Sequence, residues 1–312
     1  MELKTTLQKT KLYKKYNTWH WRERMTHPGN QYPEKTFYII RRHSNRSGLF
    51  SFYVTNLGSI VEAKKKGYTP VIDMQNSPNP MLTPERLGRE NAWTDYFLQP
   101  AGFDLRDMKD AKNVILGSIN PPEHFPDDDL LLENKESEIS FWREQAHQNI
   151  HLQDDIKKTI GEQYASISNG GRLLGVLCRG TDYLQLRPKN HPIQPDPEQV
   201  IEDCKAALQQ YHCSGIYLAT EDETIFEKFR EAFGDRVVSY QTHHYTTAPG
   251  ENLNDVANQK TDPKIRTTEY LISIGILSRC PCLIAGATSG SLGAVLMSDG
   301  FETMKIYSLG RY

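Results

Sequence analysis

The 312-residue sequence has few cysteines, no long apolar run and no excess of charge of one sign. Five cysteines are an odd and sparse set, which argues against a disulfide-stabilised secreted domain. No stretch is apolar enough over its length to span a bilayer, and the first thirty residues lack the apolar run of a signal peptide. The formal net charge of −2 argues against a general nucleic-acid binder. We therefore expect a cytoplasmic protein that binds no nucleic acid.

Several motifs of common enzyme classes are also missing. The sequence has neither G-x-G-x-x-G nor G-x-x-x-x-G-K after its first strand, so neither a dinucleotide fingerprint nor a P-loop is supported. No serine has the G-x-S-x-G spacing of a hydrolase nucleophile. Cys280 and Cys282 have no nearby histidine or second cysteine pair. We expect no metal site and no cofactor.

Residues 1–35 are polar, basic and aromatic. They have a poor apolar face, which favours a solvated N-terminal helix with a few docked aromatic side chains. The alternative is a peripheral contact with the inner face of a membrane, because basic and aromatic side chains suit an anionic interface.

Apolar runs typical of buried strands alternate with helical patterns along most of the chain. Repeated βα units of this kind predict an α/β fold with parallel, doubly wound sheets. We expect two Rossmann-like domains that face each other across a cleft, residues 1–145 and residues 146–312. The expected strands are 37–40, 69–73, 113–117, 172–178, 216–220, 237–240, 282–285 and 305–307. The expected helices are 54–66, 197–210, 223–233, 265–278 and one that begins at the 286–291 turn. Residues 137–165 are expected to be mostly helical, and residues 241–262 to form a long polar loop.

Polar residues follow three of the strands expected in the second half. Arg179-Gly180-Thr-Asp182 follows a buried strand, Thr220-Glu-Asp222 follows the next, and Gly286-Ala-Thr-Ser-Gly-Ser291 opens a helix. Ligands of open α/β sheets bind at the carboxyl ends of the strands. A small-residue helix N-terminus accepts phosphate, and an arginine adds charge-assisted hydrogen bonds to it. The three together predict a nucleotide diphosphate site, although each has a structural alternative: an Arg–Asp pair that closes a loop, a helix cap, or an ordinary turn.

The first half contributes two weaker candidates. Trp93 belongs to an aromatic cluster that ends a long loop, where it either stacks on a sugar or anchors the loop. Asp95 lies in the same cluster. The acidic run 127–129 is interpreted as a solvated turn or a helix cap rather than a metal site.

Three motifs of the second half resemble those of the α1,6/α1,2/protein-O-fucosyltransferase superfamily. They are Arg179-Gly-Thr-Asp182 followed by His191-Pro-Ile193, then Tyr217-Leu-Ala-Thr-Glu-Asp222, then Thr288-Ser-Gly-Ser291. The number of residues between the arginine and the His-Pro-Ile is most similar to that in the α1,6 branch, which includes the bacterial Nod-factor enzymes. The resemblance covers most of residues 37–309 and is specific only in the second half.

The resemblance implies a GT-B fold, GDP-fucose as donor, inversion at the anomeric carbon and no metal requirement. It also implies roles for individual residues. Arg179 would hold the β-phosphate, Asp182 would brace the arginine loop, and Asp222 would contact guanine. Thr288, Ser289 and Ser291 would line the diphosphate, and Gly180 and Thr220 would also belong to the GDP-binding site. The acceptor would be a glycan or a lipid-linked oligosaccharide in polysaccharide biosynthesis.

The sequence departs from the α1,6 pattern at three positions. Leu177, Tyr183 and Arg187 stand where that branch has a histidine, a lysine and a glutamate respectively. The glutamate is the usual candidate for the general base, so the base does not transfer. His191, Tyr183, Arg187, Trp93 and Asp95 are uncertain residues of the acceptor side. The candidates for a base are Asp182, Glu221, His191, Asp73 and Asp95, or no base at all, and the alternative function is a non-catalytic relative that binds a nucleotide sugar or glycan.

Overall fold

The computed structural model describes residues 21–312 except 180–185, 241–242, 249 and 252. Its first sheet has the strand order β1-β4-β2-β3, in which β4, β2 and β3 are parallel and β1 is an antiparallel edge. Its second sheet has the order β7-β6-β5-β8-β9 and is parallel throughout. The strands are β1 (Arg24–Thr26), β2 (Phe37–Arg41), β3 (Thr69–Asp73), β4 (Val114–Leu116), β5 (Leu173–Leu177), β6 (Gly215–Ala219), β7 (Val237–Val238), β8 (Cys282–Gly286) and β9 (Thr303–Tyr307).

The second sheet is buried on both faces, as the near-continuous apolar runs of its strands predict. Along β5, Leu174 and Val176 belong to one apolar core, whereas Leu173 and Leu177 belong to another. This alternation follows from the two-residue period of a strand. Helices α8 (Pro197–Gln210) and α9 (Glu223–Phe233) cover the first face, and α11 (Pro263–Leu277) and α12 (Ser289–Met297) cover the second.

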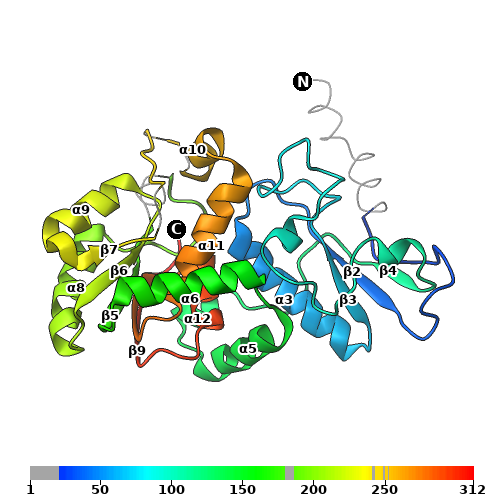
Figure 1. Cartoon of the computed structure of the whole chain (residues 1–312), viewed down its shortest axis with the longest axis horizontal. Coiled ribbons are helices and arrows are strands. Elements are labelled where there is room, and N and C mark those ends of the chain that lie inside the picture. Colours follow the sequence, from blue (N-terminus) through cyan, green and yellow to red (C-terminus); the bar gives the residue numbers. More distant parts are fainter. Residues whose placement is uncertain (1–20, 180–185, 241–242, 249, 252) are drawn as a thin grey trace.

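One apolar core runs between the two sheets. It contains Ile40 and Ile72 of the first sheet together with Leu177 and Ala285 of the second. Figure 1 shows α3 (Leu49–Lys65), α11 and α12 between the sheets, and α6 (Asp154–Ser168) runs alongside them. Helix α5 (Glu136–Asn149) packs on both α3 and α12. The expected boundary at residue 145 falls inside α5, and the division into 1–145 and 146–312 stays a prediction.

The α/β class, the parallel strands and most of the expected elements are confirmed. Helix α8 has the expected bounds, with Pro197 at its first turn and with the Asp196 side chain accepting a hydrogen bond from the Glu198 N–H, 2.9 Å away. Helix α9 also has the expected bounds.

Residues 137–165 are mostly helical, as expected; they form two helices, α5 and α6, because residues 150–153 are extended and the Leu98 N–H donates to the His151 carbonyl. Three other expectations are wrong. Helix α3 begins at Leu49 rather than residue 54, because Gly48 is its N-cap. The loop 241–262 contains α10 (Leu253–Lys260), and β1 lies in a segment where we expected no strand. The remaining short helices are α4 (Asp129–Leu132), η1 (Ala92–Asp95), η2 (Asp107–Lys109) and η3 (Gly234–Arg236).

Candidate functional site

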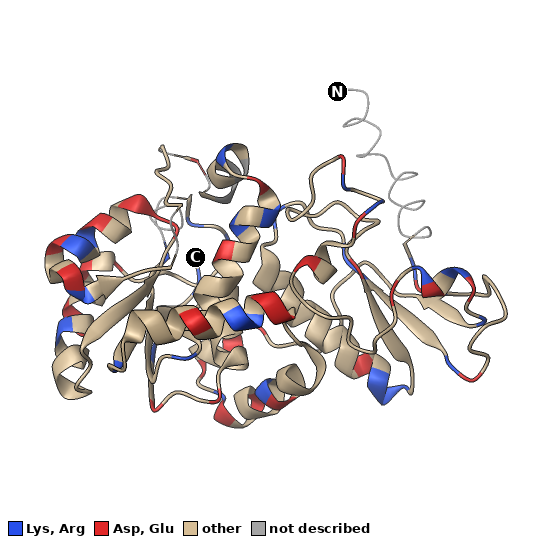
Figure 2. Cartoon of the chain, viewed as in Figure 1, with Lys and Arg blue, Asp and Glu red and all other residues tan. Residues whose placement is uncertain are grey.

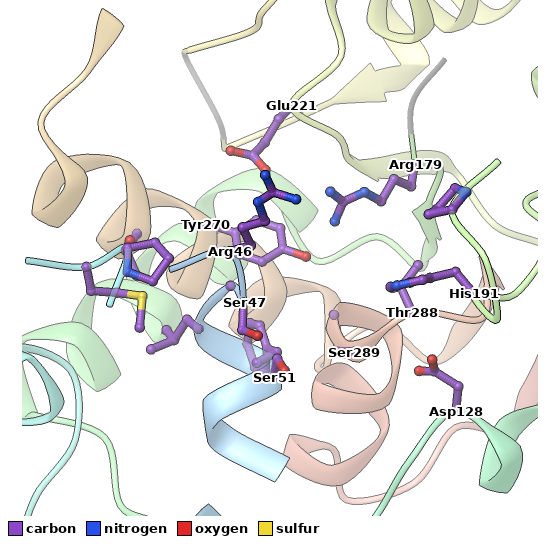
Figure 3. Close-up of a pocket in the computed structure, with 18 of the residues that line it drawn as sticks. Arg46, Ser47, Ser51, Asp128, Arg179, His191, Glu221, Tyr270, Thr288 and Ser289 are labelled. Atoms are coloured by element: carbon purple, nitrogen blue, oxygen red, sulfur yellow. The ribbon is translucent and has the colours of Figure 1, made fainter. Parts of the chain in front are cut away.

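A pocket of about 550 Å³ lies where the N-terminus of α3 meets the carboxyl ends of β5 and β8. Its wall combines polar and apolar side chains from both halves of the chain. The first half supplies residues 45–51 ahead of and within α3, residues 80–81 and Asp128. The second half supplies Arg179, the segment around His191, Glu221 and residues 287–290. Figure 3 shows these side chains around one cavity.

Arg179 enters the pocket from the carboxyl end of β5. The strand is buried over its whole length and ends at Leu177, so the chain emerges at the sheet edge two residues before the arginine. Figure 3 shows the guanidinium of Arg179 projecting into the cavity. This position agrees with the predicted binding loop. Gly180, Asp182 and Tyr183 lie outside the described residues, and their roles stay predictions.

The N-terminus of α12 forms the floor beside Arg179. Thr288 is the N-cap, and its hydroxyl accepts from the Ser291 N–H at 3.1 Å. The Ser291 hydroxyl in turn accepts from the Thr288 N–H at 2.8 Å and donates to the Gly286 carbonyl at 2.7 Å. Thr288, Ser289 and Gly290 line the pocket. We expected Ser291 to line the pocket. It is instead fully buried, and its hydroxyl stabilises the turn from the side away from the cavity.

A second helix N-terminus reaches the same pocket. Residues 45–51 precede and begin α3, whose N-cap, Gly48, makes no side-chain cap bond. Arg42 holds this segment: its guanidinium donates to the hydroxyls of Ser47 and Ser51, each at 3.1 Å. Sequence analysis missed this wall because it placed the start of the helix five residues too late. A glycine followed directly by Leu49 and Phe50 was the available signal.

Arg46 and Glu221 bring opposite charges to the pocket. Glu221 follows β6 and forms an ion pair with Arg266 of α11, with the Nε–Oε1 distance 2.9 Å and both side chains largely buried. Both partners line the pocket, and so does Arg46. Glu221 was a candidate base, but its carboxylate is already engaged by a guanidinium.

His191 lies on the opposite side of the pocket from Glu221 (Figure 3). Its segment pairs with residues 310–312: the Tyr312 N–H donates to the His191 carbonyl at 3.1 Å, and the Ile193 N–H donates to the Gly310 carbonyl at 3.0 Å. Arg311 donates to the Asn190 carbonyl at 2.8 Å and forms an ion pair with Asp129 of α4. The backbone around His191 is therefore fixed by the last residues of the chain.

Thr220 and Asp222 lie at the carboxyl end of β6 and are buried. The Asp222 carboxylate accepts from the Ile225 N–H at 3.2 Å and caps α9, while the Thr220 hydroxyl accepts from the Asp222 N–H at 3.2 Å. Neither residue lines the pocket. The helix-cap alternative is therefore confirmed, and contact of Asp222 with guanine stays a prediction.

The first-half candidates lie away from the pocket. Trp93 is fully buried, packs against Phe97 and donates from Nε1 to the Leu98 carbonyl at 3.1 Å. It anchors the loop, and in this structure no sugar can reach it. Asp95 forms ion pairs with Arg86 and Lys264.

Two further candidates also lie outside the pocket wall. Asp73 accepts hydrogen bonds from the N–H groups of Gln75 and Asn76, so its carboxylate closes the turn after β3. Arg187 is exposed, with φ +43°, and does not line the pocket.

Asp128 is a pocket residue that sequence analysis did not identify. It is the N-cap residue of α4, as the helix-cap interpretation of 127–129 predicts, but its side chain makes no cap hydrogen bond. Its carboxylate instead points into the pocket (Figure 3). Burial raises the pKa of Asp128, and the charges of Arg311 and His191 offset part of this rise.

Charge is distributed without a dominant sign outside the pocket. Figure 2 shows acidic and basic residues interspersed along α5, α6 and α9. Within the described ranges, no group of three or more His, Cys, Asp or Glu side chains is arranged to hold a metal ion. None of the helices in the described part of the chain is both long and apolar enough to cross a bilayer.

No protein-family model matches the chain, and no curated protein matches it in sequence. Several solved structures do match the chain in fold. The apo form of POFUT1 superposes with a TM-score of 0.50 at 10% identity, over 88% of this chain and 98% of that one. Fucosyltransferase NodZ from Bradyrhizobium gives 0.49 at 14% identity, over 85% and 93%. A mutant of Arabidopsis thaliana FUT1 in complex with GDP gives 0.47 at 9% identity, over 95% and 75%. The fold is thus similar to that of POFUT1, and the predicted resemblance to the fucosyltransferase superfamily is confirmed at the level of the fold.

Proposed function

We propose that the chain transfers fucose from GDP-fucose to a hydroxyl of a glycan or lipid-linked oligosaccharide, with inversion and without a metal ion. In this proposal the molecule is a GT-B enzyme. Residues 146–312 bind the donor, residues 1–145 face the acceptor, and the pocket between them is the active site. The alternative compartments, cytoplasm or the inner membrane face, remain predictions from the sequence.

The observation that carries the proposal is the convergence of Arg179 with two helix N-termini on one pocket. Helix N-termini carry a partial positive charge and backbone N–H groups that no residue of the helix accepts. Residues 48–51 of α3 and residues 288–290 of α12 present such ends to the cavity that Arg179 enters. A pocket of this size suits a small ligand. Together these groups favour a diphosphate.

Arg179 would act on the leaving group. As the bond between the sugar and the β-phosphate breaks, negative charge grows on the phosphate oxygen, and a fixed guanidinium stabilises that charge more than it stabilises the intact donor. An arginine in this place supplies what a divalent ion supplies elsewhere. Thr288 and Ser289 would contact the same phosphates.

The first test is a thermal shift with GDP, UDP and CDP, each with and without Mg²⁺. Ligand at a hundred times its dissociation constant adds about 2.7 kcal/mol to the free energy of unfolding. We expect a rise in Tm with GDP that Mg²⁺ does not change. Arg179→Ala should lose this rise and all release of GDP from GDP-fucose. Arg106→Ala, which removes an exposed arginine far from the pocket, should keep both. A larger shift with UDP would overturn the choice of donor.

A second candidate is a non-catalytic relative that binds the nucleotide sugar. The replacements at Leu177, Tyr183 and Arg187 favour it, because they remove charged groups of the α1,6 pattern. This candidate predicts a GDP shift without any consumption of GDP-fucose, so a turnover assay separates the two.

A further inference from the structure

Asp128 differs from Glu221, which also lines the pocket, and from the other described carboxylates considered as a base. Asp73, Asp95 and Glu221 are each held by hydrogen bonds or ion pairs to neighbouring groups. Among the described residues, by contrast, none donates a hydrogen bond to the Asp128 side chain, and its own helix does not use it as a cap. An acceptor group that lines a cavity and accepts no hydrogen bond from the described residues can accept one from a ligand.

The position of Asp128 also suits work on the acceptor. It follows β4 in the chain as the N-cap residue of α4, and α4 packs on α5 and on β9 of the second sheet, so Asp128 lies on the side of the cavity formed by α12 and His191 (Figure 3). An inverting transfer needs the acceptor hydroxyl on the face of the sugar opposite the leaving phosphate. Asp128 lies across Thr288 from Arg179 on the cavity wall (Figure 3), so a donor whose phosphates contact Arg179 and Thr288 would leave Asp128 to contact the acceptor hydroxyl.

The surroundings of Asp128 suit proton transfer. Burial is the largest influence and raises the pKa of its carboxyl group, and the neighbouring Asp127 and Asp129 act in the same direction. Arg311 and His191 act against it. A carboxylate with a raised pKa is a stronger base than an ordinary surface carboxylate.

We propose that Asp128 is the general base of this reaction, an inference that rests on the proposed transfer from GDP-fucose. The carboxylate accepts the proton of the acceptor hydroxyl as that oxygen bonds to the anomeric carbon. The bond from this carbon to the β-phosphate oxygen breaks, and its electron pair leaves with GDP, beside Arg179. Asp128 then releases the proton to solvent. The same step hydrolyses the donor when water is the acceptor.

Asp128→Asn tests the assignment, with GDP-fucose as donor and water as acceptor. We expect kcat for GDP release to fall by about a hundredfold or more, the usual contribution of a general base, while the Kd for GDP from calorimetry stays within about twofold of wild type. The acid-side decline of the wild-type pH–rate profile should disappear in the variant. Asp127→Asn, one residue away and exposed, should match wild type in kcat and Kd, and its acid-side decline should remain but move to lower pH, because it loses a charge that raises the pKa of Asp128.

Three outcomes would contradict the inference. If Asp128→Asn turns over within about threefold of an active wild type, Asp128 is not the base. If Kd rises in parallel with the loss of kcat, Asp128 binds the donor instead. Asp128→Glu keeps a carboxylate and should retain more turnover than Asp128→Asn, so equal losses in two folded variants would also overturn it. A wild-type protein that neither binds GDP nor consumes GDP-fucose would instead overturn the proposed function, and with it this inference.

Discussion

The ring of Phe50 in α3 lies directly against Gly293 in α12. A Cβ added at Gly293 would be only 2.1 Å from Cδ1 of Phe50. Since Phe50 is itself buried and lines the pocket, this contact positions the α3 N-terminus against the α12 N-terminus. The close approach of the two helices depends on the missing side chain.

Gly293→Ala should therefore destabilise the protein. The added methyl has no space in a packed core, and overpacking of this kind costs about 1–3 kcal/mol. Urea unfolding measures the loss. Gly161→Ala is the matched control: it lies within α6, the nearest atom to an added Cβ is 3.8 Å away, and alanine is favoured over glycine in a helix by up to about 1 kcal/mol. Equal stability of Gly293→Ala and wild type would contradict this account of the contact.

Arg311→Ala should move the acid-side decline of turnover to higher pH. Arg311 is one of the charges that lower the pKa of Asp128 against the effect of burial, so its loss should raise that pKa further. Arg311→Lys keeps the charge and should move the profile less. The ion pair with Asp129 is partly exposed, so little of the stability should be lost. A pH–rate profile that is the same in all three proteins would show that Arg311 does not act on the titrating group.

Asp203→Asn should remove stability that depends on pH. Burial acts to raise the pKa of Asp203, but hydrogen bonds from Lys305 and Tyr307 outweigh it, and the net pKa is lowered. A folded-state pKa below the unfolded value, about 3.9, gives stability that is present above that value and is lost as the pH falls through the folded pKa.

The difference in free energy of unfolding between wild type and Asp203→Asn should thus be larger at pH 7 than at pH 3. Tyr307→Phe removes one of the donors and should show a smaller change of the same sign. If Asp203→Asn unfolds at the same urea concentration as wild type at pH 7, the paired carboxylate contributes no net stability.

The folded protein should react slowly with a thiol reagent at pH 8. All five cysteines are buried, and burial raises the pKa of Cys204 to about 12 and that of Cys213 to about 11. The thiolate is the reactive form, so both access and ionisation are restricted. Release of the coloured thiolate from the reagent should reach five equivalents per chain only in denaturant. Rapid labelling of the native protein would show local opening of the second sheet.

Most of the second half could be predicted from the sequence because its local signals agree with one another. The strand at Leu173–Leu177 is apolar throughout, and the following helix begins with Asp196 and Pro197, both typical of that position. The bounds of this strand and this helix depend on burial and capping within a few residues, which the local sequence shows. Arg179 and Thr288 were therefore correctly placed at one edge of the sheet.

The first half was harder to predict because contacts between residues far apart in the sequence determine where its helices begin and end and which side chains reach the pocket. Helix α3 is buried on nearly every side, so its apolar residues have no clear period, and the first turn was missed. The break before α6 depends on pairing of Leu98 with His151, which no local pattern reveals. Asp128 looked like an exposed acid in a run of three, and only the fold places it in the pocket.

The apolar core that contains both Ile40 and Leu296 couples the two sheets during heating and after destabilising mutations. Because the residues between the sheets belong to one apolar cluster, loss of packing on the inner face of one sheet should also disturb the inner face of the other. Heating should produce a single cooperative transition, and separately expressed halves should remain insoluble or unfolded. A destabilising mutation in the first sheet would then lower the fraction of folded molecules. Nucleotide binding at the second sheet would fall for this reason, although no atom of the pocket is changed.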